Sequence, residues 1–527
     1  MKKIVILLLT TVIILHAKDY TLQKWQVLDM NFSVQEKVKD PLYMTIGAEF
    51  IHSSGTVMTI PGFYNDNQEW IIRFCPDLEG NWAYTTYASL PELAGKRGVI
   101  TVKRKKKKDE HGPITICEKN PQKFLYADGT PYFLTAFECD WLYALDAENP
   151  DDIPRTEQMI RHIKDNKFNQ IVMNIYTYDA NWGDKDKMAQ KYLFDKPKVF
   201  PFGGSNDKPD YSTLNIDFFK RLDRVIEHLD EAEIISHLMI YVWNKKVNWP
   251  EPGSKADNRY FDYVVKRYQA YPNLIWDISK EALAYGRDDM EYITERIDRL
   301  RKLDGHQRLL SVHDYAYCDT YPDKVDFISI QEWRPNLYSV MRDVAKKHAT
   351  KPVFNIEHGG YEKTMHMVFT GPAFNDPKTC LDRNYQCIFA GTYSTYYWQN
   401  ASWYEVIYEP EKLPKQNQPN FHWYKHMIEF FERYNFNQLD PYQGSFTPYC
   451  LTNNDDLYIF YATKMMERLT GDMKALKGKS VTIKWFDPYT GKYLNGGKRE
   501  FVGSWLGIDK PEELKEQIAV GILEIVK

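Results

Sequence analysis

The feature that most constrains the fold is a regular alternation of short strands and longer helices between residues 120 and 435. Apolar and β-branched runs predict strands at 132–137, 169–176, 236–243, 273–278, 308–313, 325–330, 352–356 and 392–398. Between them, segments such as LNIDFFKRLDRVIEHLDEA carry apolar residues at three- and four-residue spacing, which predicts amphipathic helices. Such a series of strand–helix units is what a (β/α)₈ TIM barrel requires. The alternative is an open doubly wound sheet, but the glycine-rich turn typical of its first strand is missing.

Two β-rich segments flank this region. Residues 20–105 contain short alternating runs such as WQVLDMNFSV, separated by turn residues, and predict a β-sandwich. Residues 440–527 predict a small C-terminal β-sandwich, in which DPYTG is a hairpin turn. We therefore expect a multidomain chain with domains at 20–105, 120–435 and 440–527.

Composition narrows the choice of partners. The chain has 68 Lys and Arg against 72 Asp and Glu, so its net charge of −4 gives no sign of nucleic-acid binding. The basic run 103–108 is better explained as a solvated strand end and linker than as a site for a polyanion. Aromatic residues make up 15% of the chain, which fits either sugar-binding clefts or a large aromatic core. The seven cysteines show no metal-binding spacing, and we expect mostly buried free thiols.

The first 17 residues have the pattern of an export signal. Lys2 and Lys3 precede an apolar run from Ile4 to Leu15, which is too short to span a bilayer. Ala17 is a possible cleavage point, and no lipobox cysteine follows the run. We expect a periplasmic or secreted protein without stable membrane insertion after the signal is removed.

In a (β/α)₈ barrel the functional side chains follow the carboxyl ends of the strands. Read in this way, the sequence offers carboxylates, amides and aromatic rings, and no serine–histidine–aspartate set, HExxH motif or phosphate loop. The candidates at the strand ends are Glu138, Asp140, Trp141, Asn174, Tyr176, Trp243, Lys280, Glu281, His313, Gln331, Trp333, Glu357, His358 and Trp398.

Glu281 and Glu357 follow the fourth and seventh strands, which lie on roughly opposite sides of an eight-stranded barrel. Two opposed carboxyl groups can catalyse glycoside hydrolysis, one by protonating the leaving oxygen and the other as a carboxylate on the opposite side of the bond. Their separation decides the stereochemistry: about 5–5.5 Å indicates retention and about 6.5–9.5 Å inversion. No metal or organic cofactor is expected.

Each candidate also has a structural explanation. Glu281 fits the first turn of a helix, where the helix dipole favours a carboxylate. The glycines after His358 either allow a ligand to approach the backbone or only shape a turn. His313 and His358 could equally be structural histidines, and Trp141, Trp243 and Trp398 could be sugar platforms or barrel packing.

Several motifs together resemble a known group. They are WQVLDMNF, the pattern F-x-P-x-x-x-G-x-W from Phe74 to Trp82, NLIWDISKEA, KPVFNIEHGGYE and WFDPYTG, in this order along nearly the whole mature chain. The chain is similar to bacterial glycoside hydrolases of the retaining (β/α)₈ clan, the apiosidase-like and cellulase-like barrels. These carry an Ig-like N-terminal domain of unknown function and a small C-terminal β domain of a type sometimes described as collagen-binding.

The resemblance implies a polysaccharide or oligosaccharide substrate and a role for each glutamate. The family pattern W-x-x-x-N-E falls on 276–281, so Glu281 takes the acid/base position, and Glu357 takes that of the nucleophile. Lys280 stands where the family has an asparagine that binds the sugar hydroxyl next to the anomeric carbon. A lysine there could contact a different group and hold a neighbouring carboxyl ionised. It also leaves open a rival function, a carbohydrate-binding barrel without catalysis.

Overall fold

The computed structural model describes residues 18–105, 110–181, 185–286, 289–362 and 375–526. The expected export signal, residues 1–17, lies outside them, as does part of the basic run. The chain divides into two compact units. One holds the residues up to Glu110 together with Asn258–Pro272 and Arg299–Gln307, and the other holds the remainder.

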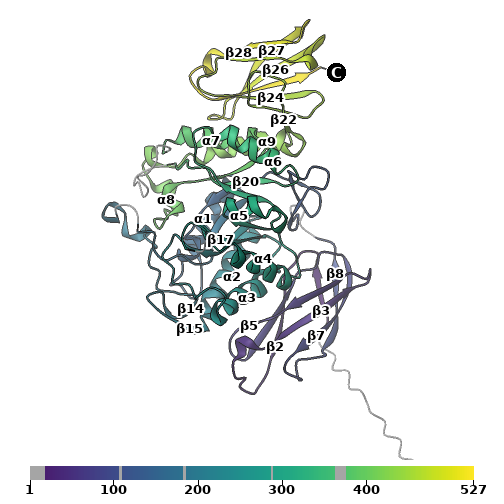
Figure 1. Ribbon diagram of the computed structural model, residues 1–527, viewed down its shortest axis with the longest axis vertical. Coiled ribbons are helices and arrows are strands. Elements are labelled where there is room, and N and C mark those ends of the chain that lie inside the picture. Colours follow the sequence, from purple (N-terminus) through teal and green to yellow (C-terminus); the bar gives the residue numbers. More distant parts are fainter. Residues whose placement is uncertain (1–17, 106–109, 182–184, 287–288, 363–374, 527) are drawn as a thin grey trace, which may run out of the picture. The chain divides into compact units, whose positions relative to one another are not determined.

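The second unit contains one parallel eight-stranded sheet, which confirms the predicted barrel (Figure 1). Its order is β18-β17-β16-β13-β12-β21-β20-β19, so each strand neighbours those before and after it in the alternating region. The strands are β12 (Thr135–Glu138), β13 (Gln170–Asn174), β16 (Ile235–Val242), β17 (Leu274–Lys280), β18 (Leu310–His313), β19 (Ile328–Gln331), β20 (Val353–Glu357) and β21 (Tyr393–Tyr396).

The barrel closes between β18 and β19 through individual hydrogen bonds. The Asp326 N–H donates to the Leu310 carbonyl at 2.8 Å. The Ser311 hydroxyl lies 2.9 Å from the Phe327 carbonyl and 3.1 Å from Ser329 Oγ. These contacts complete the ring of strands, so the carboxyl ends meet around one mouth.

Helices alternate with these strands along the chain. They are α1 (Pro154–Asp165), α2 (Ile216–Glu231), α3 (Lys255–Tyr268), α4 (Met290–Leu303), α5 (Tyr315–Thr320), α6 (Leu337–Lys347), α7 (Pro377–Phe389), α8 (Gln399–Ser402) and α9 (Phe421–Arg433). Helix α2 packs on β16, α5 on β18 and β19, α6 on β20 and α7 on β21. The Asn215 side chain caps α2 by accepting from the Phe218 N–H, which fixes where this helix begins.

The bounds of the barrel strands shift by one to three residues from the sequence-based expectation, and two of these shifts change how the site is built. The predicted first strand, 132–137, is divided because Pro131–Tyr132 forms β11 and pairs with β10 (Phe124–Tyr126) outside the barrel. The fourth strand continues to Lys280 instead of ending at 278. A hairpin of β14 (Phe202–Ser205) and β15 (Lys208–Leu214), which the sequence did not indicate, lies between β13 and α2.

The N-terminal segment forms the predicted sandwich. One sheet is ordered β1-β8-β7-β3-β4 and the other β2-β6-β5. Their bounds are β1 (Tyr20–Gln23), β2 (Leu28–Ser33), β3 (Ile46–His52), β4 (Val57–Pro61), β5 (Phe63–Tyr64), β6 (Glu69–Phe74), β7 (Gly80–Ala88) and β8 (Arg97–Lys103). Phe74 stacks on Phe50 at 4.0 Å and meets Trp82 edge-on, so two residues of the F-x-P-x-x-x-G-x-W pattern lie in the core.

The C-terminal segment is a second antiparallel β domain. A sheet ordered β22-β23-β24-β29-β26-β27 is accompanied by the pair β25-β28. The strands are β22 (Asp440–Pro441), β23 (Cys450–Thr452), β24 (Leu457–Ala462), β25 (Arg468–Asp472), β26 (Lys479–Phe486), β27 (Tyr493–Phe501), β28 (Trp505–Asp509) and β29 (Ala519–Ile525). Trp485 and Leu523 are among its buried core residues.

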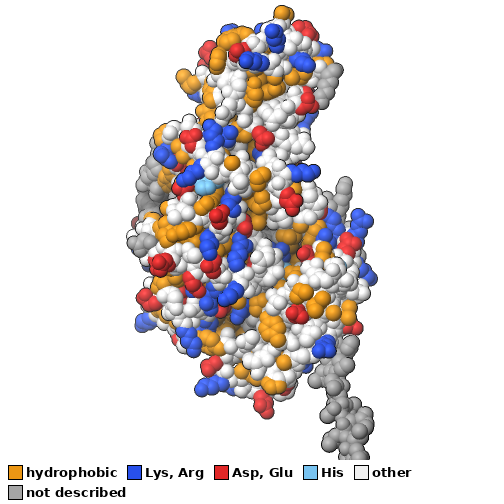
Figure 2. All heavy atoms as spheres, turned by 45° about the vertical axis from the view of Figure 1, so that its right-hand side comes forward, with side chains coloured by type: hydrophobic (Ala, Val, Ile, Leu, Met, Phe, Trp, Pro, Cys, Tyr) orange, Lys and Arg blue, Asp and Glu red, His pale blue; other side chains and the backbone are white. Residues whose placement is uncertain are grey.

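Acidic and basic side chains are intermixed over the face seen in Figure 2. All seven cysteines are free thiols, and six of them are buried. Within the described ranges no helix is both long and apolar enough to cross a bilayer.

Candidate active site

The strand that carries the first candidate glutamate is bulged at its carboxyl end. Pairing of β17 with β18 is regular up to Asp277 and resumes at Lys280, with one more residue on β17 than on β18. Glu281 follows with a left-handed backbone, φ 56°. A bulge re-aims the side chains after it, and a positive φ outside glycine is a strained state found often at functional sites. Local geometry therefore brings the adjacent residues Lys280 and Glu281 into one site.

The strand of the second candidate glutamate has a matching irregularity. Between β19 and β20 the pairing passes from Ile330 with Asn355 to Gln331 with Glu357, which leaves one extra residue on β20. Both bulges lie at the last residues of their strands. The two glutamates are thus held by strand ends rather than by long loops.

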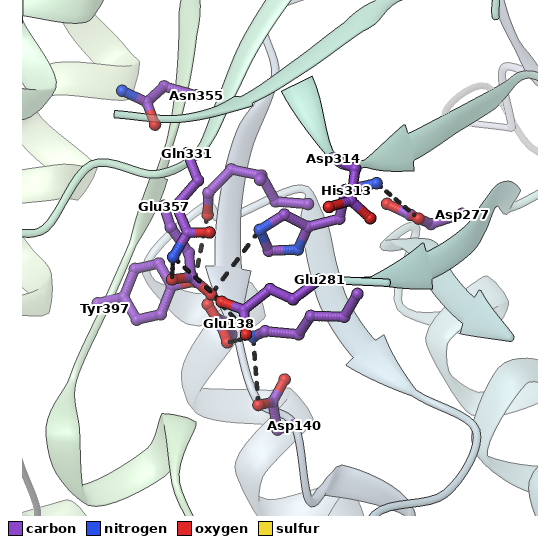
Figure 3. A network of polar contacts seen from close by, with 12 residues as sticks. Glu138, Asp140, Asp277, Glu281, His313, Asp314, Gln331, Asn355, Glu357 and Tyr397 are labelled. Carbon is purple, nitrogen blue, oxygen red and sulfur yellow. Dashed lines mark hydrogen bonds and ion pairs between the residues drawn. The ribbon is translucent and has the colours of Figure 1, made fainter. Parts of the chain in front are cut away.

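A single amide joins the two glutamates (Figure 3). Gln331 Nε2 donates to Glu357 Oε2 at 2.6 Å and to Glu281 Oε1 at 3.2 Å. Both distances start at one nitrogen, so these two carboxylate oxygens are at most about 6 Å apart, within reach of a single glycosidic bond. Among the described residues, the buried Glu281 Oε2 has no hydrogen-bond partner.

Lys280 lies among three carboxyl groups. Its Nζ is 2.7 Å from Glu138 Oε1, 2.8 Å from Glu357 Oε1 and 3.4 Å from Asp140 Oδ2. Asp140 Oδ2 is also 3.1 Å from Lys245 Nζ. Glu138 is the last residue of β12 and Asp140 lies two residues further on, and both lysines are buried. Four side chains from the sequence prediction, Glu138, Asp140, Lys280 and Glu357, therefore form one contiguous network.

Burial and charge set the protonation of this network. Burial raises the pKa of Glu357, and the Lys280 ammonium opposes that rise. Burial also raises the pKa of Glu138 well above its ordinary value, with Asp140 and Glu357 adding to the effect. The two lysines outweigh burial at Asp140 and lower its pKa, and the surrounding carboxylates raise the pKa of Lys280. The favoured state has Lys280 charged, Asp140 ionised and Glu138 neutral.

The two predicted histidines have different surroundings. His313 Nε2 lies 3.9 Å from Glu357 Oε1, and burial lowers the pKa of His313 well below its usual value, so the ring beside the carboxylate is neutral. His358 accepts from the Gly360 N–H through Nδ1, and its Nε2 lies 3.0 Å from Asn384 Nδ2 on α7. These contacts give His358 a structural anchor, whereas His313 faces the candidate nucleophile.

The predicted aromatic residues are spread over several environments. Trp333 packs edge-on against Tyr361 at 5.5 Å. It lies over Gly359, where an added Cβ would come within 2.7 Å of its ring. Trp398 meets Phe421 of α9, and Tyr176 packs against Phe200, Phe218 and Tyr143, which are contacts of barrel packing. Trp243 stacks on Tyr241, Trp141 is buried edge-on against Tyr404, and Asn174 is buried at the end of β13.

The described residues include no cluster of three or more His, Cys, Asp or Glu side chains arranged to hold a metal ion.

Comparison with known proteins assigns the barrel to a family. The model of the apiosidase-like catalytic domain family matches residues 118–430, more than half of the chain. The chain belongs to the apiosidase-like family. The model of a domain of unknown function, DUF5060, matches residues 21–89 ahead of the apiosidase-like barrel. A search of curated proteins found no match.

Solved structures share the fold of this apiosidase-like chain at low identity. A candidate glycoside hydrolase from Bacteroides vulgatus is 18% identical, with a TM-score of 0.76 over 96% of this chain and 100% of that one. A glycoside hydrolase family 5 protein from the same organism is 14% identical, with a TM-score of 0.58 over 79% of this chain and 93% of that one. The fold is therefore one that glycoside hydrolases use.

The apiosidase-like barrel also contains a buried support that sequence reasoning missed. His237 Nε2 lies 3.0 Å from Asp277 Oδ2, and Asp277 Oδ1 accepts from the Ser279 and His313 N–H groups. Asp277 therefore fixes the backbone at Ser279 in the β17 bulge and at His313 on β18, and His237 contacts the other oxygen of Asp277. His237 and Asp277 lie inside strands, where inspection of strand ends could not find them.

Two further residues were missed nearer the mouth. Asp314 Oδ2 accepts from the Ala282 N–H at 2.8 Å and so fixes the turn that begins at Glu281. Lys245 pairs with Asp140 two residues after Trp243. Their position after a strand was a signal for both.

Proposed function

We propose that this chain is an exported glycoside hydrolase that cleaves a polysaccharide or glycan with retention of configuration. The single observation that carries the proposal is the shared donor, Gln331, which keeps an oxygen of Glu281 and an oxygen of Glu357 within about 6 Å. That bound is compatible with the retaining separation. The family and the glycoside hydrolase fold support the same reaction class.

The chemistry uses the two glutamates in turn. In the first step Glu281 gives its proton to the glycosidic oxygen while a Glu357 oxygen bonds to the anomeric carbon and the bond to the leaving group breaks. In the second step Glu281 removes a proton from water, and the water oxygen bonds to the anomeric carbon. The bond to Glu357 breaks, its electron pair returns to the carboxylate, and Glu281 is protonated again.

One observation favours a second function, a carbohydrate-binding barrel without catalysis. Lys280 Nζ is 2.8 Å from Glu357 Oε1, so an ion pair already engages one oxygen of the candidate nucleophile. If substrate binding does not break this ion pair, the site binds a glycan without cleaving it.

A glycan panel with product analysis separates the two functions. Wild type, Glu281→Ala and Glu357→Ala are assayed together with Glu332→Gln, a control for a neighbouring glutamate that pairs with Arg334. The proposal expects cleavage of at least one glycan by wild type and the control, and losses of at least about 100-fold in both alanine variants. Cleavage by both alanine variants at the wild-type rate would refute the site. Tight glycan binding without cleavage by wild type would favour the second function.

Export is tested separately. The basic and apolar pattern of residues 1–17 supports it. Expression of the full chain in a Gram-negative host, with cell fractionation and N-terminal sequencing, should give a periplasmic or secreted protein that begins near residue 18. Full-length protein in the cytoplasm would contradict export without bearing on hydrolysis.

A further inference from the structure

We propose that Lys280 is a positioning residue that stabilises the Glu357 carboxylate as a leaving group and so promotes breakdown of the glycosyl-enzyme. This inference rests on the proposed retaining mechanism. It concerns the residue at which this chain departs from the family pattern.

The Lys280 ammonium has three N–H groups, one for each of three neighbouring carboxyl groups. The three acceptor oxygens are Glu138 Oε1, Glu357 Oε1 and Asp140 Oδ2. Glu138 and Asp140 lie on β12 and its end, across the mouth from β17. Two partners at the end of β12 therefore hold the ammonium without Glu357.

This arrangement matters because the charge of Glu357 changes during the reaction. In the glycosyl-enzyme Glu357 is a neutral ester, and Lys280 loses one of its anionic partners. Asp140 still holds the ammonium, since the adjacent Lys245 also keeps Asp140 ionised. Lys280 therefore stays charged and fixed beside the Glu357 oxygen on which negative charge develops when the glycosyl-enzyme breaks down.

Lys280 accelerates breakdown of the glycosyl-enzyme more than any other step. As water attacks the anomeric carbon, the bond between that carbon and Glu357 breaks and its electron pair moves to the carboxylate. A charge-assisted hydrogen bond from Lys280 strengthens as this charge develops. The same bond weakens Glu357 as a nucleophile in the first step, so the two steps respond to Lys280 in opposite directions.

Other groups around Glu357 do not duplicate this role. Gln331 is a neutral donor on the opposite oxygen, and His313 is neutral at 3.9 Å. The titratable and charged groups that interact with Glu357 are Glu138, Asp140, Lys280, Glu281, Tyr285, His313 and Tyr361. Within this set Lys280 is the cation with a contact to the Glu357 carboxylate.

The test compares Lys280→Met with wild type on the 2,4-dinitrophenyl glycoside of the sugar that wild type cleaves in the panel. Its good leaving group makes the first step fast, so breakdown of the intermediate limits turnover. We expect kcat to fall on the order of 10- to 100-fold. KM should fall with it, so that kcat/KM stays within about threefold. Intact-protein mass spectrometry of the quenched variant should show one added glycosyl residue.

Further variants separate this role from a structural one. Lys280→Arg, which keeps the charge, should recover part of kcat and reduce the adduct. Lys123→Gln removes a buried lysine outside this network and should not accumulate adduct beyond wild type. If Lys280→Met does not fold, Lys280→Gln carries the same expectation.

Two results overturn the inference. One is an unchanged kcat in Lys280→Met, and the other is an equal loss of kcat and kcat/KM without adduct. In both cases wild type still cleaves the substrate with retention, so the proposed function survives. A wild type that cleaves nothing in the panel removes both proposals.

Discussion

Glu281 and Glu357 share one hydrogen-bond donor, although they come from different barrel strands. The Gln331 side-chain amide reaches Glu357 at 2.6 Å and Glu281 at 3.2 Å. Gln331 is itself exposed at the mouth, so this link lies at the surface of the candidate site and not in the core.

Gln331→Ala should therefore reduce activity without affecting the fold. Loss of a hydrogen bond to a charged group costs about 1.5–3 kcal/mol, which corresponds to a fall in kcat on the order of 10- to 100-fold. Because the side chain is exposed, the free energy of unfolding should change by less than about 0.5 kcal/mol. Steady-state kinetics and thermal unfolding of the same preparation check both parts. A large loss of stability would mean that Gln331 holds the fold instead.

Asp314 should matter through the position of Glu281. Its carboxylate accepts the Ala282 N–H, and burial raises the pKa of Asp314 to about 7. Asp314→Asn keeps an acceptor oxygen and should retain most activity, whereas Asp314→Ala should lose at least about 10-fold in kcat. Equal activity of the two variants would show that the turn after Glu281 does not need this bond.

Glu138→Gln should change how stability depends on pH. The pKa of Glu138 is raised in the folded state, so its contribution to stability is complete below the ordinary glutamate pKa of about 4.3. The contribution is lost as pH rises through the folded-state pKa. Glutamine does not titrate, so the stability of the variant relative to wild type should rise as pH rises above the ordinary glutamate pKa. Thermal or denaturant unfolding at several pH values measures this difference.

Asp140→Asn is the matched control with the opposite sign. The pKa of Asp140 is lowered by the two lysines, so its contribution to stability is present above the ordinary aspartate pKa and is lost as pH falls. The variant should therefore be most destabilised near neutral pH. Parallel pH curves for Glu138→Gln and Asp140→Asn would contradict the assignment of a neutral Glu138 beside an ionised Asp140.

Gly359→Ala should destabilise the protein and displace Trp333. Gly359 has φ 76°, and an added Cβ would lie 2.7 Å from the Trp333 ring. Gly95→Ala is the control, because Gly95 has a similar φ of 74° but no atom within 4 Å of the added carbon. We expect a cost of about 1–2 kcal/mol at Gly95 from the backbone alone and a larger cost at Gly359. Denaturant unfolding of both variants separates the steric effect from the conformational one.

The sequence predicted the barrel because its periodicity is local and repeated. Each strand and each helix carries its own pattern, and eight such units leave few ways to close a sheet. The expectation that functional groups follow the strands then led to Glu281, Glu357, Lys280 and Gln331, which the structure brings together. Their catalytic roles remain predictions.

What the sequence could not reveal depends on register and orientation. The extra residues in β17 and β20 appear only when the strands are paired, and they decide that Lys280 and Glu281 enter one site. His237 and Asp277 look like ordinary strand residues until their contact is seen. Tyr176 follows a strand, as the other candidate residues do, and its contact with Phe218 of α2 is not predictable from strand-end position, which does not determine which way a side chain points.

The stereochemistry of the first product tests the central claim most directly. A glycoside of known configuration, chosen from those that wild type cleaves, is followed by proton NMR from the first minutes of the reaction, before the product mutarotates. Two carboxylate oxygens held within about 6 Å by Gln331 predict that the anomeric configuration is retained. A first product of inverted configuration would contradict the double-displacement mechanism and the role of Glu357 as nucleophile.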